Sequence, residues 1–110
     1  MEHLNQMTTL EKELDQFAKS RQIGSEQAKP LLDQYYSLLM DYFYAINQVE
    51  PTSLAQLDLG TLTIVPFNID DRLAYIQERK HHYMGYQQMK TLKSELIKMY
   101  AAYRARHHIE

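Results

Sequence analysis

The sequence contains no cysteine among its 110 residues, and it has only three glycines. Without cysteine, a disulfide framework, a thiolate zinc site and a cysteine nucleophile are all excluded. The glycines, Gly24, Gly60 and Gly85, lie too far apart in the sequence to form a phosphate-binding loop. The composition therefore excludes cystine-stabilised folds, thiolate metal centres and glycine-rich nucleotide sites.

The sequence also lacks an apolar segment long enough to cross a bilayer. Its densest apolar stretch, residues 31–46, carries Asp33 and Asp41 and is shorter than the roughly 20 residues that a membrane span requires. The first residues show neither the basic region nor the apolar region of a secretory signal. We therefore expect a cytoplasmic protein with no membrane association.

The most informative feature that is present is the same stretch, LLDQYYSLLMDYFYAI, in which 12 of 16 residues are apolar or aromatic. At helical spacing these residues form two neighbouring stripes, Leu31, Tyr35, Leu38, Tyr42 and Ala45 beside Leu32, Tyr36, Leu39, Phe43 and Ile46. Two adjacent stripes give an apolar arc far wider than a surface helix needs. The pattern predicts a central helix at 30–48 that several other elements contact.

Further helices are predicted at residues 8–22, 69–80 and 86–107, and a short helical turn at 53–57. Thr8 and Glu11 fit a capping box at the start of the first helix. Gly24 suits a left-handed residue after its end, and Asn68 suits the N-cap of the helix at 69–80. These signals define the predicted boundaries.

Residues 61–67, TLTIVPF, alternate as a strand does, but the sequence offers no second strand for pairing. We interpret them as an extended connector whose Leu62, Ile64 and Phe67 insert into the helical core. The predicted fold is all-α, a single helical domain over residues 1–110. It is a compact bundle of four or five helices around the Tyr/Leu-rich helix.

Charge is divided unevenly along the chain. Residues 1–64 hold four Lys/Arg and nine Asp/Glu, a net charge of −5, whereas residues 65–110 hold eight and five, a net charge of +3. The asymmetry could steer a partner or let the two halves attract each other. On the last helix the cations spread around several faces, so nucleic-acid association through this basic half is the weakest functional hypothesis.

The histidines give little indication of a metal site. His81 and His82 are adjacent, as are His107 and His108, and neighbouring residues on a helix point about 100° apart. Neither pair alone therefore forms a two-ligand face of the kind that zinc sites use. We predict neither a metal ion nor a cofactor.

The best candidate site is the segment from Arg79 to Gln87, and Arg79, His82, Tyr83 and Tyr86 are its candidate binding residues. Tyr and Arg are favoured in binding hot spots because they combine contact area with polar tips. We expect Arg79, Tyr83 and Tyr86 to share an exposed, partly apolar surface. The structural alternative is that both tyrosines cover the core and only their hydroxyl groups reach solvent.

The leading functional hypothesis is a non-enzymatic interaction module, a monomer or homodimer, that binds another cytoplasmic protein. The alternative is a small ligand-binding protein or enzyme with a Tyr/His/Arg pocket near residues 75–87. A pocket converging on those side chains would favour the alternative, and an exposed apolar patch would favour the module.

The C-terminal half resembles a known family. The run VPFNIDDRLAYI at residues 65–76, followed by Arg79, Tyr83, Tyr86 and Gln87, is similar to the YpoC-like family of small bacterial proteins. The likeness is best over residues 65–103 and looser over the tyrosine-rich helix. It implies a helical cytoplasmic protein and brings no catalytic residues.

Overall fold

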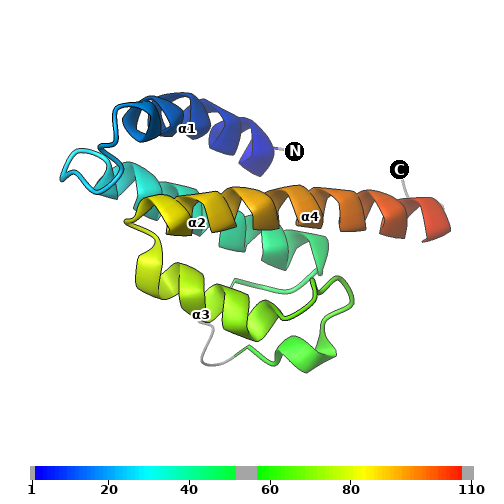
Figure 1. The fold of residues 1–110 in the computed structure, drawn as a ribbon. Helices are drawn as coiled ribbons and strands as arrows, with labels where there is room; N and C mark the ends of the chain where they lie inside the picture. Colours follow the sequence, from blue (N-terminus) through cyan, green and yellow to red (C-terminus); the bar gives the residue numbers. More distant parts are fainter. Residues whose placement is uncertain (1, 52–56, 108–110) are drawn as a thin grey trace.

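The computed structural model describes residues 2–51 and 57–107. These residues form four α-helices and one short 3₁₀ turn, with no strand among them. The helices are α1 (Glu2–Lys19), α2 (Lys29–Ile46), α3 (Ile69–Arg79) and α4 (Tyr83–His107), and the turn is η1 (Leu59–Thr61). The predicted all-α bundle is confirmed (Figure 1). The helical turn predicted at 53–57 lies, except for Leu57, outside the described residues.

The helix α2 occupies the centre, as its two apolar stripes predicted. It packs against α1 and α4, while α3 packs against α4 on the side away from α1 (Figure 1). Pro30 lies in the first turn of α2. The backbone N–H groups there have no acceptor within the helix, so the missing N–H of proline costs no hydrogen bond. The buried residues of α2 are Leu32, Tyr35, Leu39, Met40, Tyr42, Phe43, Tyr44 and Ile46.

The first helix begins earlier than predicted. It starts at Glu2, so Thr8 is an interior residue, and its hydroxyl donates to the Leu4 carbonyl 2.9 Å away. The capping-box prediction was therefore wrong. A Thr hydroxyl can donate to a carbonyl of the preceding turn within a helix, or it can cap the N-terminus of a helix. The capping-box pattern in the sequence does not distinguish these two positions.

The end of α1 uses an arginine where a glycine was predicted. Arg21 has a left-handed φ of 59°, and no glycine has a positive φ. The Gln22 N–H donates to the Phe17 carbonyl at 2.7 Å and the Arg21 N–H to the Ala18 carbonyl at 3.1 Å, the two bonds of a Schellman motif. Gly24 therefore does not terminate the helix.

The segment after η1 is a connector, as predicted, and the Asn47 side chain supplies hydrogen bonds to one of its residues, Ile64. The Asn47 side chain accepts from the Ile64 N–H at 2.7 Å and donates to the Ile64 carbonyl at 3.0 Å, replacing a neighbouring strand. Ile64 is buried and Leu62 packs against the core. Phe67, in contrast, is 91% exposed, so its predicted place in the core was wrong. The next residue, Asn68, has a left-handed φ of 61°.

The last helix begins at Tyr83, three residues before its predicted start. A Cβ atom at position 85 would lie 1.7 Å from the Arg79 carbonyl oxygen, so only glycine fits where α4 passes the end of α3. Gly85 thus permits the close turn between the helices instead of breaking α4. Asn68 precedes α3 as predicted, although its side chain makes no capping hydrogen bond.

Candidate functional site

An open pocket lies at the end of the bundle where the α1–α2 connection meets the turn between α3 and α4. It has a volume of about 470 Å³ and is lined by Ala18, Arg21, Ile23, Gly24, His82 and Tyr83. The Schellman motif at the end of α1 positions Arg21, and the turn permitted by Gly85 positions His82 and Tyr83. The site thus joins two segments that lie about sixty residues apart in the sequence.

Two large apolar side chains are exposed here, Tyr83, which lines the pocket, and Met84, which follows it in the chain. Tyr83 is 52% exposed and Met84 is 53% exposed, both in the first turn of α4. We call the group formed by Arg21, His82, Tyr83 and Met84 the turn surface. Its combination of a basic side chain, an imidazole and exposed apolar area matches the composition of protein-binding patches.

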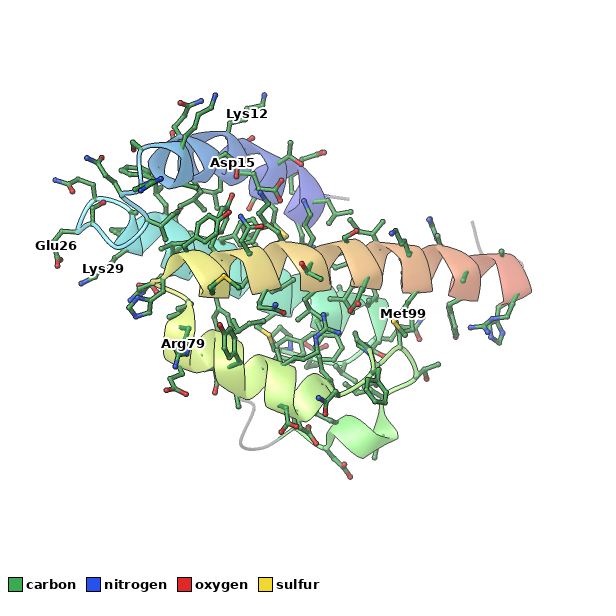
Figure 2. All side chains as sticks on the ribbon, in the orientation of Figure 1. Lys12, Asp15, Glu26, Lys29, Arg79 and Met99 are labelled. Atoms are coloured by element: carbon green, nitrogen blue, oxygen red, sulfur yellow. The ribbon has the colours of Figure 1, made fainter. Side chains whose placement is uncertain are left out.

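The structure places two of the four predicted site residues at this surface and two elsewhere. His82 and Tyr83 line the pocket, but Arg79 does not. The Arg79 guanidinium is exposed and lies over the Tyr75 ring, 5.4 Å from its centroid. Figure 2 shows Arg79 at the end of α3.

Tyr86 is fully buried, so the expectation that it shares an exposed surface with Tyr83 was wrong. Its ring meets that of Tyr35 edge-on, with centroids 5.7 Å apart. Its hydroxyl donates to Asp15 of α1 at 2.7 Å, so it does not reach for solvent either. The physical reason is that the carboxylate of a third helix supplies the polar partner that a buried phenol needs.

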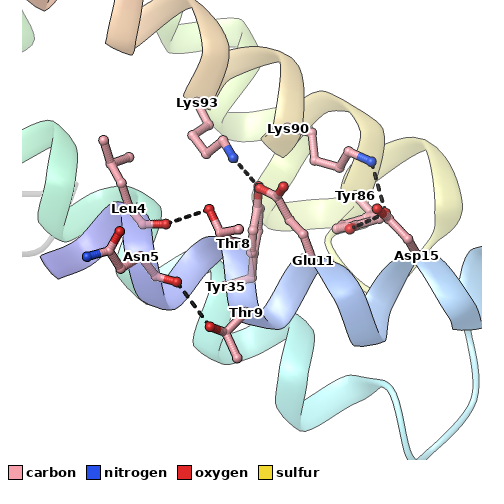
Figure 3. Close-up of polar contacts among 10 residues, drawn as sticks. All are labelled: Leu4, Asn5, Thr8, Thr9, Glu11, Asp15, Tyr35, Tyr86, Lys90 and Lys93. Carbon is pink, nitrogen blue, oxygen red and sulfur yellow. Dashed lines mark hydrogen bonds and ion pairs between the residues drawn. The ribbon is translucent and has the colours of Figure 1, made fainter. Parts of the chain in front are cut away.

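Tyr86 belongs to a layer of polar contacts between α1, α2 and α4. The Tyr35 hydroxyl donates to Glu11 at 2.6 Å, and Lys93 donates to the same carboxylate oxygen. One turn further along α1, Asp15 accepts from Tyr86 and from Lys90 at 2.9 Å (Figure 3). We call these residues, Glu11, Asp15, Tyr35, Tyr86, Lys90 and Lys93, the tyrosine layer.

The electrostatics of the tyrosine layer favour a structural role. Burial raises the pKa of Tyr35 and of Tyr86 far above the ordinary range, and the neighbouring carboxylates raise it further. Burial also disfavours the charged form of Asp15, but hydrogen bonds from Tyr86 and Lys90 outweigh it and lower the Asp15 pKa. Both phenols therefore stay protonated near neutral pH, which makes them hydrogen-bond donors and not bases.

Several opposite charges of the two halves form ion pairs with each other within the molecule. Lys90 and Lys93 of the basic half pair with Asp15 and Glu11 of the acidic half. A third link joins α2 to the α3–α4 turn, where Asp33 accepts from His81 at 2.7 Å and lies 3.2 Å from Lys80. Of the two readings of the asymmetry, attraction between the halves is thus realised in the structure. These lysines carry little uncompensated charge for a nucleic acid.

The remaining histidines and acidic residues do not converge. Within residues 2–51 and 57–107 no group of three or more His, Asp or Glu side chains could hold a metal ion. His81 contacts Asp33, whereas its neighbour His82 lines the pocket, as expected for adjacent residues that point apart. In the same part of the chain no helix is both long and apolar enough to cross a membrane.

Sequence reasoning missed two members of the turn surface. Arg21 follows a helix end that the sequence misplaced, and nothing in the sequence indicates that it lies next to His82. Met84 lay within the candidate segment but was not among the four residues singled out for binding. The left-handed conformation of residue 21 could have been predicted only if the sequence had shown that α1 ends two residues earlier, because such a residue commonly follows the end of a helix.

Comparison with known proteins identifies one family. No curated protein and no solved structure matches the chain. A family model described as YpoC-like protein matches residues 1–108, which includes the tyrosine layer and the turn surface as well as the C-terminal half. The chain therefore belongs to the YpoC-like family.

Proposed function

We propose that this protein is a non-enzymatic interaction module that binds another cytoplasmic protein through its turn surface. The observation that carries the proposal is the exposure of Tyr83, which lines the pocket with Arg21 and His82, and of Met84, the next residue of α4. Aromatic residues, Met and Arg are the side chains enriched in the cores of protein interfaces. Tyr86, the buried tyrosine of the same helix, has its partners within the molecule, whereas half of the Tyr83 surface is open to solvent.

The chemistry of the turn surface favours an acidic segment that also carries an apolar side chain. Arg21 can pair with a carboxylate in a two-pronged geometry. The apolar side chain would pack against Tyr83 and Met84 over the pocket. The tyrosine layer, with its protonated phenols and paired lysines, offers no free base or nucleophile and stays outside the proposed site.

A display library of short random peptides tests the proposal. We expect selection on the wild-type protein to enrich acidic peptides with an apolar residue. Calorimetry should then show that Tyr83→Ser with Met84→Ser weakens their binding about tenfold or more. Phe67→Ser is the matched control, because it removes an exposed aromatic ring from a different surface. Selected peptides that bind the double variant as tightly as the wild type would overturn the proposal.

The contribution of Arg21 can be separated from its backbone role. Arg21→Gly removes the cation but suits the left-handed conformation, and Gln48→Gly is its control because Gln48 has the same φ of 59° at the end of α2. We expect Arg21→Gly to weaken binding of the acidic peptides and to make that binding less sensitive to salt. Gln48→Gly should leave both properties unchanged.

The alternative function is binding of a small ligand in the pocket. Its volume of about 470 Å³ falls within the range of ligand sites, about 300–1,000 Å³. A metabolite library screened by thermal shift tests this alternative. A compound that stabilises the wild type but not His82→Ala or Tyr83→Ser, with no peptide selected, would favour it over the interaction module.

A further inference from the structure

We propose that Met84 is a reversible oxidation site, and that its reaction with a peroxide weakens binding at the turn surface. The oxidant transfers one oxygen atom to the thioether of Met84, which becomes a sulfoxide. The inference rests on the proposed function, because the modification acts on the same surface. It adds a chemical signal to which that surface responds.

Met84 differs from the other methionines in its exposure. Of the methionines that the structure describes, Met84 alone is exposed, with 53% of its surface open to solvent in the first turn of α4. Met7 and Met89 are fully buried, and Met40 keeps only 6% of its surface. Met99, further along α4, is half-buried and packs against the core. A peroxide in solution therefore reaches the Met84 sulfur first, because a buried sulfur reacts only when the bundle opens.

The exposure of Met84 is fixed by the two residues that follow it. Gly85 lies against the backbone of Arg79, so closely that no Cβ atom would fit. Tyr86 is fully buried, and its hydroxyl donates to Asp15 of α1 at 2.7 Å. The first turn of α4 cannot rotate Met84 toward the core without breaking both contacts. The sulfur is thus held in solvent.

The chain contains no sulfur that reacts with peroxide faster than a thioether. Cysteine thiolates are the usual first targets of peroxides, and the sequence has no cysteine. The oxidation chemistry of the folded protein is therefore concentrated on its exposed methionine. That methionine lies on the surface that we propose as the binding site.

The reaction is a balanced oxygen transfer. A lone pair of the Met84 sulfur attacks one oxygen of hydrogen peroxide, so that a sulfur–oxygen bond forms as the oxygen–oxygen bond breaks. The proton on the transferred oxygen passes to the departing hydroxide, which leaves as water. The sulfur is oxidised by two electrons and the peroxide is reduced by two. The thioether supplies these electrons itself, so no further reactant enters the step.

The sulfoxide changes the part of the turn surface that would contact an apolar side chain. Tyr83 and Met84 provide the exposed apolar area of this surface. Oxidation converts the flexible apolar side chain of Met84 into a polar one, whose oxygen loses its water when an apolar partner packs over it. Because Met84 is exposed, the same change leaves the packing of the core intact. Oxidation should therefore lower the affinity for the partner without lowering the stability of the fold.

Mass spectrometry after treatment with dilute hydrogen peroxide tests the selectivity of the reaction. The native protein is treated, digested and mapped, so that each methionine reports its own rate of sulfoxide formation. We expect Met84 to react about tenfold faster, or more, than Met7 and Met89, because the buried sulfurs react only during opening of the bundle. The melting temperature should stay unchanged when Met84 is oxidised. Equal rates for exposed and buried methionines would overturn the inference.

Calorimetry with the acidic peptides selected on the wild-type protein tests the consequence. Once the peroxide has been removed, the oxidised wild type should bind these peptides about tenfold more weakly. Met84→Leu keeps an apolar side chain without a thioether, so its binding should not respond to peroxide. Met99→Leu is the matched control, because it removes a half-buried methionine elsewhere on α4 and should respond as the wild type does. Oxidised wild type that binds as tightly as the reduced protein would contradict the inference and leave the proposed function intact.

Reversal of the reaction completes the test. Methionine sulfoxide reductases of both stereospecificities, added with a thiol reductant, should restore peptide binding to the oxidised protein. Binding that stays lost would contradict a reversible site. If no peptide is selected in the first place, the proposed function fails and the effect on binding fails with it, whereas the mass measurement still decides whether Met84 is the preferred site of oxidation.

Discussion

Tyr83 and Tyr86 lie three residues apart on α4, yet they belong to opposite kinds of region. Tyr86 is fully buried in the tyrosine layer, where Tyr35 covers its ring and Asp15 accepts its hydroxyl hydrogen. Tyr83 is the first residue of the helix, and half of its surface remains exposed beside the pocket. Residue type and helical spacing do not separate the two. What separates them is whether a third element supplies a partner.

The comparison assigns the two regions different roles. In the tyrosine layer each charged side chain pairs with one from another helix. These ion pairs between α1 and α4 help to hold α1 on the bundle. At the turn surface Tyr83 and Met84 keep large exposed areas, which contribute nothing to stability. Removal of these two side chains should therefore change stability little, and if the proposed function is correct it should weaken binding.

The largest effect is expected from Leu39→Asp in α2. Leu39 is fully buried in the helix that both α1 and α4 contact. An unpaired carboxylate there should cost more than about 4 kcal/mol, close to the whole stability of a small domain. Circular dichroism should show loss of the cooperative transition. A normal melting temperature would contradict the central place of α2.

Gly85→Ala should also destabilise the protein strongly, although alanine favours helices. The added methyl group would overlap the Arg79 backbone, so the turn before α4 must open at a cost of about 1–3 kcal/mol. Gly24→Ala is the control, because its added methyl group has no neighbour closer than 3.9 Å. Urea unfolding of both variants measures the difference. Equal stabilities would show that the close turn is not required.

Tyr86→Phe removes one hydrogen bond and leaves the ring in place. The loss of a buried bond to a charged acceptor should cost about 1–2 kcal/mol, whereas Tyr83→Phe should cost almost nothing. Thermal unfolding should separate the two variants clearly. If both melt with the wild type, the Asp15 contact adds nothing to stability.

The smallest effect concerns acid. The folded-state pKa of Asp15 is lowered, so its stabilising contribution is present above the ordinary value near 3.8 and is lost as pH falls through the folded value. Asp15→Asn should therefore make stability fall less steeply below about pH 4. Urea midpoints measured between neutral pH and acid check this, and an unchanged slope would contradict it.

The fold class followed from the sequence because apolar stripes report burial directly. The double stripe of α2 placed the central helix, and the lack of a partner strand correctly argued against a strand at residues 61–67, of which Thr61 ends η1. The resemblance over residues 65–103 also led to the correct family, which the family model extends over residues 1–108. These inferences rest on patterns repeated over many residues.

Inferences about single residues failed where burial is determined by the local direction of the chain or by a contact with a distant segment. Phe67 was placed in the core because it is apolar, but the buried Pro66 and Ile69 on either side leave its ring outside. Tyr86 was placed on the surface because it is near Arg79 in sequence, but Asp15 lies close to it only in the folded chain. Arg21 was missed for the same reason, since its neighbour His82 comes from the turn between α3 and α4, about sixty residues further along the chain.

The free energies of unfolding of two alanine variants in urea can separate a structural Tyr86 from an exposed Tyr83 that is available for binding. Tyr86→Ala leaves a cavity in the core and removes the Asp15 contact, so it should lose about 3–5 kcal/mol. Tyr83→Ala should stay within about 0.5 kcal/mol of the wild type, as surface substitutions do. Similar losses for the two variants would contradict the account, because Tyr83 would then be a structural residue and not an exposed binding residue.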